Sequence, residues 1–217
     1  MEDESTSRTS SRPLDTPVSI AIEGEINDTT LSEVRDALQT VRDAHQTTLL
    51  IEIASDGGSV YACLAIIDLL RAWLAEDNQH TLTTFATHAF SAAVNIFSLG
   101  SVRVASPLST FMNHCVSGGL EGEVTKMKQQ LEEADRVNKL CDAELAKTIG
   151  DEATALLCSN GEKYIDAQKA LEIGLATHVG HVRARVDVSL SINSVTIPPA
   201  AERPPARKRA RRSTAVR

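Results

Sequence analysis

The chain has 217 residues, of which 42% are hydrophobic, 24% are charged and only 3% are aromatic, and its formal net charge is −7. This length is enough for one sizeable domain with a core of Ala, Leu, Ile and Val. No apolar run is long enough to cross a membrane, and the first residues lack the order of a secretory signal, so we expect a cytoplasmic protein. The four cysteines show no Cys-x-x-Cys spacing, which predicts free thiols and no metal site.

Two terminal segments have the composition of flexible arms. Residues 1–17 are rich in Ser, Thr and charged residues. Residues 191–217 end in a basic run, which cannot bury an apolar face. Such a run could contact an anionic partner, either a nucleic acid or the acidic body of a neighbouring subunit, but short basic runs bind polyanions weakly. We therefore interpret it as a disordered, solvated tail and expect no nucleic-acid partner.

Between these arms, over residues 18–190, apolar patterns alternate between strand and helix. Residues 18–22 predict a strand, and an Asn after it can cap a helix with apolar residues at helical spacing. Residues 49–53 and 81–86 predict two further strands, separated by a largely apolar helix over 60–74. This alternation predicts an α/β domain with a mostly parallel sheet and crossover helices.

The residues with the clearest chemistry follow these strands. Ser91 lies in a small-residue turn that opens an apolar segment, and His114 closes the next one. A serine attacks a carbonyl group only if a neighbouring base takes its proton, so an exposed serine with a histidine folded back onto it indicates acyl transfer. Upstream, a strand ends at Gly57 and Gly58, where backbone N–H groups can face an oxyanion.

Each of these residues also has a simpler interpretation. Ser is favoured at a helix N-cap, so Ser91 could only cap a helix. His114, taken alone, is more often a hydrogen-bonded and partly buried histidine. His88 competes with it as the base, but we interpret His88 as a residue that lines the site. Ser98, two helical turns beyond Ser91, is expected to pack in the core.

The second half of the chain predicts a projecting helix. Gly118 and Gly119 form either a turn or an edge strand that pairs with a substrate peptide. Over about residues 122–148, charged residues outnumber apolar ones and leave a thin apolar stripe, which suits a helix that packs against another subunit. Residues 181–190 alternate apolar and polar and predict a late strand.

Taken in order, these motifs resemble the ClpP family, the proteolytic subunits of Clp proteases, over about residues 18–182. Residues 53–68 resemble the family's Gly-Gly-Ser-Val segment and the helix after it, and residues 87–101 resemble its nucleophile turn. Residues 112–122 fall where the family has its catalytic histidine and a glycine-bearing strand. The resemblance implies a ClpP/crotonase-like spiral of βαβ units in which residues 122–148 form a projecting handle.

The resemblance also implies a function. It implies a serine endopeptidase with Ser91 as nucleophile, His114 as general base, and the backbone N–H groups of Gly58 and Ala92 as the oxyanion hole. No metal or organic cofactor is implied. The implied setting is ATP-dependent proteolysis of unfolded polypeptides inside a ring or double ring of identical subunits, fed by an ATP-dependent unfoldase.

One part of the family's pattern has no counterpart here. The family carries a third catalytic residue, an aspartate, after the handle. Counting forward along the chain places this position at Ser159, whereas counting backward places it at Cys158, and neither side chain is a carboxylate. Asn160 and Glu162 are the nearest polar alternatives, and an Asn can hold a histidine tautomer without supplying a charge.

Three other functions are compatible with this sequence. The missing aspartate is what an inactive structural subunit of a mixed Clp ring would show. The basic tail is compatible with a phage-type capsid maturation protease. The wider crotonase-like superfamily uses related oxyanion holes on acyl-CoA thioesters, but such enzymes do not need the paired Ser91 and His114.

Overall fold

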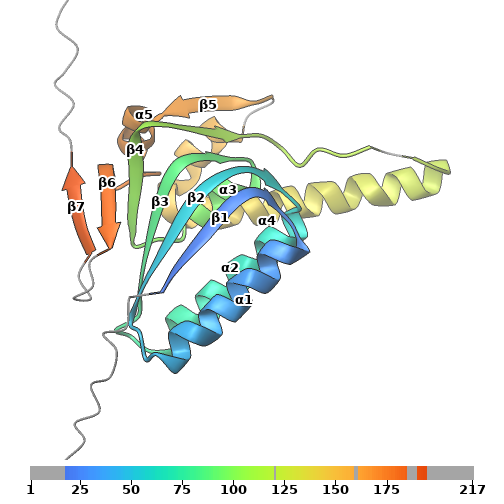
Figure 1. Ribbon diagram of the computed structural model, residues 1–217. Coiled ribbons are helices and arrows are strands. Elements are labelled where there is room, and N and C mark those ends of the chain that lie inside the picture. The colour runs from blue at the N-terminus through green and yellow to red at the C-terminus, as the bar shows by residue number, and fades with distance from the viewer. Residues whose placement is uncertain (1–17, 120, 159–160, 185–189, 195–217) are drawn as a thin grey trace, which may run out of the picture.

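The computed structural model describes residues 18–119, 121–158, 161–184 and 190–194 (Figure 1). The strands are β1 (Ser19–Ile26), β2 (Thr48–Gly58), β3 (Thr81–Phe90), β4 (Val102–Asn113), β5 (Lys163–Asp166), β6 (His178–Ala184) and β7 (Leu190–Ser194). The helices are α1 (Asp28–Asp43), α2 (Val60–Glu76), α3 (Ala92–Phe97), α4 (Val124–Leu157) and α5 (Ala167–Glu172). The N-terminal arm and most of the basic tail lie outside the described residues.

The strands form a mostly parallel sheet in the order β1-β2-β3-β4-β6-β7, and β5 pairs with β4. Neighbours from β1 to β4 and the pair β4–β6 run parallel, whereas β4–β5 and β6–β7 run antiparallel. The helices α1, α2 and α3 are the crossovers between consecutive parallel strands, and α1 and α2 lie along one face of the sheet (Figure 1). The predicted α/β class is therefore confirmed.

The core lies between this sheet and its crossover helices. The apolar residues of β2 are buried on both sides of the strand, as expected for a central parallel strand. Helix α2 adds a second buried layer through Ile66, Leu70 and Trp73. Phe97 of α3 packs against Phe111 of β4, with ring centroids 4.9 Å apart. This packing fixes the ends of β2, β3 and β4 relative to one another.

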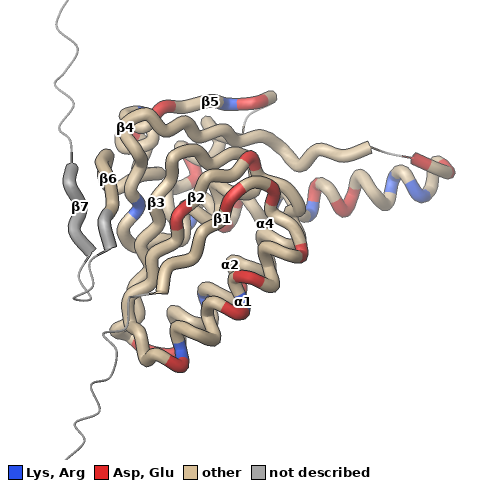
Figure 2. The backbone as a smooth tube through the Cα atoms, in the orientation of Figure 1, with Lys and Arg blue, Asp and Glu red and all other residues tan. Residues whose placement is uncertain are grey.

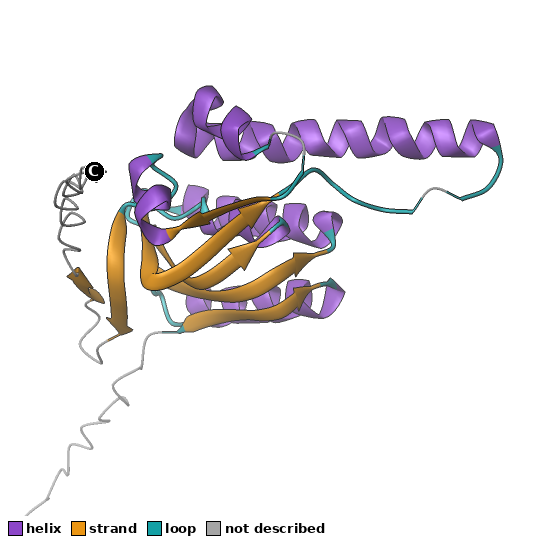
Figure 3. Ribbon diagram, turned by 90° about the horizontal axis from the view of Figure 1, so that it is seen from above, coloured by secondary structure: helices purple, strands orange, loops and turns teal. Residues whose placement is uncertain are grey.

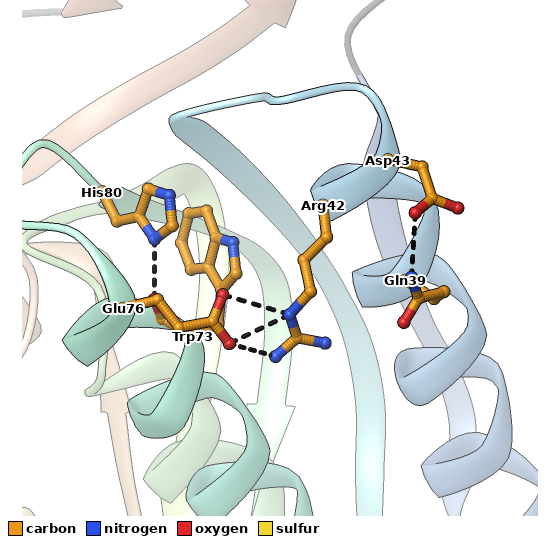
Figure 4. A network of polar contacts seen from close by, with 6 residues as sticks. All are labelled: Gln39, Arg42, Asp43, Trp73, Glu76 and His80. Atoms are coloured by element: carbon orange, nitrogen blue, oxygen red, sulfur yellow. Dashed lines mark hydrogen bonds and ion pairs between the residues drawn. The ribbon is translucent and has the colours of Figure 1, made fainter.

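Helix α1 begins at a capping box. The Asn27 side chain accepts from the backbone N–H groups of Thr29 and Thr30, and the Thr30 hydroxyl accepts in return from the N–H of Asn27. At the other end, the Arg42 guanidinium donates to both carboxylate oxygens of Glu76 and joins α1 to α2 (Figure 4).

A stacked pair of rings covers the end of α2. The imidazole of His80 lies 4.3 Å from the indole of Trp73, measured between ring centroids, with the planes 9° apart. Its Nδ1 atom lies 2.7 Å from the carbonyl oxygen of Trp73 (Figure 4). The end of α2 is thus fixed before the chain enters β3.

The long helix α4 projects well beyond the sheet (Figure 3). Acidic and basic residues alternate along it (Figure 2), and pairs such as Lys139 with Asp135 link successive turns. Gly150 interrupts the helix with φ 80° and ψ 165°, so the last turns run in a new direction. Most of residues 122–148 thus lie in the first part of α4, and the last turns bring Leu157 into the core. The handle role of this segment stays a prediction.

Three details of the C-terminal half differ from the sequence-based expectations. The late strand expected over 181–190 is instead two antiparallel strands, β6 and β7, and β7 takes in residues 191–194 that were assigned to the tail. Gly118 and Gly119 belong to a segment, residues 114–119, without regular secondary structure, so no edge strand forms there. The short strand β5 and helix α5 were not predicted individually.

Candidate active site

Ser91 lies at the turn between β3 and α3, in an unusual backbone conformation. Its φ is 53° and its ψ is −123°. Residues other than glycine rarely adopt such a positive φ. Its N–H group donates to the carbonyl of Met112 at 2.7 Å, which holds the turn against the end of β4. Although Ser91 occupies the N-cap position of α3, its side chain makes no capping hydrogen bond. The hydroxyl group is therefore free to face another partner.

That partner is His114, which directly follows β4. The Nε2 atom of His114 lies 2.8 Å from the Oγ atom of Ser91. The two residues are 23 positions apart in the sequence and meet because β3 and β4 are parallel neighbours that end at the same edge of the sheet. A histidine at this distance can accept the hydroxyl proton, which is the geometry that an activated serine requires.

The glycine pair lies directly behind this turn. A Cβ atom on Gly57 would lie 2.7 Å from the carbonyl oxygen of Phe90 and 2.8 Å from Cβ of Ser91, so no larger residue fits without moving the serine. A Cβ atom on Gly58 would overlap the backbone of Ile26. Both glycines also have positive φ values, 94° and 146°. The sequence pattern at residues 57–58 thus has a steric cause.

A cavity of about 480 Å³ opens beside Ser91 and His114. Ser91, His114, Gly58 and Ala92 all line it, so the two residues expected to supply oxyanion N–H groups lie beside the serine. Residues of α4 also line the cavity, among them Asp142. The lining includes carboxylates but no Lys or Arg among the residues that the structure describes.

Cys158, one of the four residues open as the third catalytic member, lies close to the site. Its Sγ atom accepts a hydrogen bond at 3.1 Å from Nδ2 of Asn113, the residue directly before His114 in the chain. Burial is the main cause that raises the pKa of this thiol, followed by hydrogen bonding to the Asp142 carboxylate. A thiol with a raised pKa stays neutral, so Cys158 brings no charge to the histidine.

The other candidates are not at the site or cannot be placed. Glu162 is exposed, and its carboxylate accepts a hydrogen bond from the Tyr164 hydroxyl at 2.9 Å. Ser159 and Asn160 lie outside the described residues. Sequence reasoning missed Asp142, a residue of α4 that lines the cavity 16 positions before Cys158 in the chain.

Two residues near Ser91 in the chain have other partners. Nε2 of His88 lies 3.5 Å from a carboxylate oxygen of Asp56, and its ring packs edge-on against Phe90. Ser98 is buried, and its hydroxyl donates to the carbonyl of Asn95 at 2.8 Å. The expected core position of Ser98 is confirmed.

The described residues also bear on disulfides, metal sites and membrane spans. Cys63, Cys115, Cys141 and Cys158 are all free thiols. Burial, with the neighbouring charges of Asp142 and Glu144, raises the pKa of Cys141 to about 11. Within the described ranges, no group of three or more His, Cys, Asp or Glu side chains could hold a metal ion. None of the described helices is both long and apolar enough to span a membrane.

These features define an α/β protein with a serine–histidine pair at the end of a parallel sheet. Comparison with known families places it more closely, because the family model described as "Clp protease" matches residues 2–183. The chain belongs to the Clp protease family, a family of serine peptidases, and its fold is the ClpP fold.

Curated relatives agree with this family at low identity. The chain is 30% identical to ATP-dependent Clp protease proteolytic subunit 2 of Corynebacterium jeikeium over 131 residues, which cover 58% of this chain and 61% of that protein. It is 26% identical to proteolytic subunit 1 of Corynebacterium glutamicum over 160 residues, 71% of this chain and 75% of that protein. It is 29% identical to the ATP-dependent Clp protease proteolytic subunit of Ostreococcus tauri over 133 residues, 59% of this chain and 64% of that protein. The chain thus spans about three fifths of the length of the first of these relatives.

Proposed function

We propose that this protein is a ClpP-like serine endopeptidase in which Ser91 is the nucleophile and His114 the general base. The observation that carries this proposal is the 2.8 Å distance between Oγ of Ser91 and Nε2 of His114, in front of an open cavity. Membership of the Clp protease family supports the same chemistry. The unusual backbone of Ser91 supports it as well, because strained residues persist where function requires a fixed geometry.

The reaction follows the general course of acyl transfer. His114 accepts the proton of the Ser91 hydroxyl as Oγ attacks the peptide carbonyl, and the backbone N–H groups of Gly58 and Ala92 stabilise the resulting oxyanion. The tetrahedral intermediate collapses as His114 gives its proton to the leaving amine, which leaves an ester on Ser91. Water, activated by the same histidine, then hydrolyses this ester and restores the serine.

The proposed setting is an oligomeric barrel of identical subunits that receives unfolded polypeptides from an ATP-dependent unfoldase. The names of the relatives, which are ATP-dependent proteolytic subunits, support this setting. The exposed apolar residues of α4 support contacts between subunits, because Val124 and Leu131 are 68% and 60% exposed on a helix that projects from the sheet.

Labelling with a fluorophosphonate probe tests the chemistry directly. Purified full-length protein and its Ser91→Ala and His114→Ala variants are treated with the probe, and the covalent adduct is measured by intact mass. We expect one adduct on the parent and none on Ser91→Ala. For His114→Ala we expect the labelling rate to fall by about a thousandfold or more, because the serine has lost its base. Ser98→Ala, which changes a buried serine on the same segment, is the matched control and should label like the parent.

A second candidate function has its own supporting observation. Cys158, one of the four candidates for the family's aspartate position, is a neutral thiol beside Asn113, as an inactive structural subunit of a mixed ring would allow. Failure of the folded parent to label would contradict the peptidase proposal and favour this alternative. Mixing the protein with an active ClpP-type subunit and measuring peptide cleavage would then test the structural role.

A further inference from the structure

The cavity that holds the serine–histidine pair also contains a carboxylate that the family pattern does not use. Asp142 belongs to α4 and lines the same cavity as Ser91 and His114. The Asp142 carboxylate also contributes to the raised pKa of the Cys158 thiol, after burial, and Sγ of Cys158 accepts from the side chain of Asn113. Asp142 is therefore part of the polar surroundings of the segment that carries His114.

Helix α4 holds the chain on both sides of His114. Before the histidine, Asn113 donates from Nδ2 to Sγ of Cys158 at 3.1 Å. After the histidine, the backbone N–H of Val116 donates at 2.6 Å to Oδ1 of Asn138, which lies on α4 one helical turn before Asp142. The imidazole is thus carried by a segment that α4 fixes at two points.

Two carboxylates line the cavity beside His114, those of Asp56 and Asp142. The titratable groups that line the cavity are Asp56 on β2, Tyr61 on α2, and Cys141 and Asp142 on α4. Cys115 and Cys158 flank the segment that carries His114, and Asp56 already faces His88. No Lys or Arg of the described residues lines the cavity, so nothing cationic on its walls competes for Asp142.

We propose that Asp142 is a positioning residue for the Ser91–His114 pair and supplies, from α4, the negative charge that the family's missing aspartate would provide. This proposal rests on the proposed peptidase function. When the Ser91 proton moves to Nε2 of His114, the imidazole becomes positively charged. The Asp142 carboxylate, on the wall of the same cavity, stabilises that charge, and α4 holds the segment that carries the ring through the bond from Val116 to Asn138.

The test measures how fast a fluorophosphonate probe labels Ser91 in the full chain as the pH varies. We expect Asp142→Asn to lower the labelling rate at pH 7 by about tenfold or more, since a remote charge contributes less than a directly bonded one. The pH midpoint of labelling should change with it, because the protonated histidine loses its stabilising charge. Asp142→Glu, which keeps the charge, should stay within about threefold of the parent. Asp142→Ser is made alongside in case Asp142→Asn does not fold.

Two further variants separate positioning from a merely structural role. Asp135→Asn removes an exposed carboxylate from the same helix, whose partner is Lys139, and should label like the parent. Cys158→Asp, introduced into Asp142→Asn, places a carboxylate at one of the candidate positions of the family's aspartate and should restore most of the lost rate. Equal thermal unfolding midpoints for these chains show that the differences are not due to folding.

Three outcomes would overturn the proposal. If the parent labels and Asp142→Asn labels at the same rate with the same pH midpoint, the peptidase function stands and the role of Asp142 does not. A loss seen only with a fluorogenic peptide carrying Arg before the scissile bond, and not with the matching Leu peptide, would make Asp142 a substrate contact instead. If the folded parent does not label at all, the proposed function fails, and this inference fails with it.

Discussion

The position of Ser91 depends on Gly57, because a side chain on Gly57 would collide with it. We expect Gly57→Ala to destabilise the protein by about 2 kcal/mol or more, because the new Cβ would meet Phe90 and Ser91 and the φ of 94° disfavours alanine. The labelling rate of Ser91 should fall more than stability alone explains, since the serine must move away from His114. Urea unfolding and probe labelling measure the two effects.

A matched control for this change is Gly24→Ala. Gly24 has a φ of 69°, but a Cβ there meets no atom within 4 Å. We expect a loss of about 1 kcal/mol from the backbone conformation and no change in the labelling rate. Equal labelling of Gly57→Ala and Gly24→Ala would contradict the steric explanation for the glycine pair.

At this scale, sequence reasoning recovers part of the candidate site. Ser91 and His114 could be identified because their residue types and order are specific, and the structure brings them together as expected. Asp142 could not, because nothing in a helical run of charged residues distinguishes one carboxylate from its neighbours.

Helix α1 depends on its capping box, and this dependence can be measured separately from the site. We expect Asn27→Ala to lower the free energy of unfolding by about 1 kcal/mol, because the N–H groups of Thr29 and Thr30 lose their acceptor. Asn27→Asp keeps an acceptor and should be nearly neutral. Urea unfolding gives both values, and a loss of equal size in the two variants would show that the capping bonds are not the cause.

The sequence predicts the elements of the first half better than those of the second. The strands β1 to β3 and helices α1 and α2 have long apolar patterns, and the structure confirms each of them with extended bounds. The strand β5 has only four residues, of which two are exposed and none is fully buried, so it has little apolar pattern to detect. Its pairing with β4 comes from tertiary contacts, which no local pattern encodes.

At the scale of the whole molecule, the projecting part of α4 is the surface on which assembly should depend. We expect Leu131→Asp to shift the protein toward smaller species, because a charge would replace an apolar side chain that is 60% exposed. Size-exclusion chromatography with light scattering measures the change. Thr125→Asp adds the same charge on a different face of the helix and should leave the distribution unchanged. Identical molar masses for the parent and Leu131→Asp would show that this stripe does not mediate assembly.

The bend at Gly150 divides α4 into two limbs with separate neighbours. Asp142 lies on the limb that projects and lines the cavity, whereas Cys158 ends the limb that returns to the sheet and accepts from Asn113. Any tilt of the projecting limb relative to the sheet therefore changes the separation of Asp142 and Cys158. Whatever the handle packs against sets the angle of this helix far from Ser91. That packing therefore sets where Asp142 lies relative to the reacting serine and histidine.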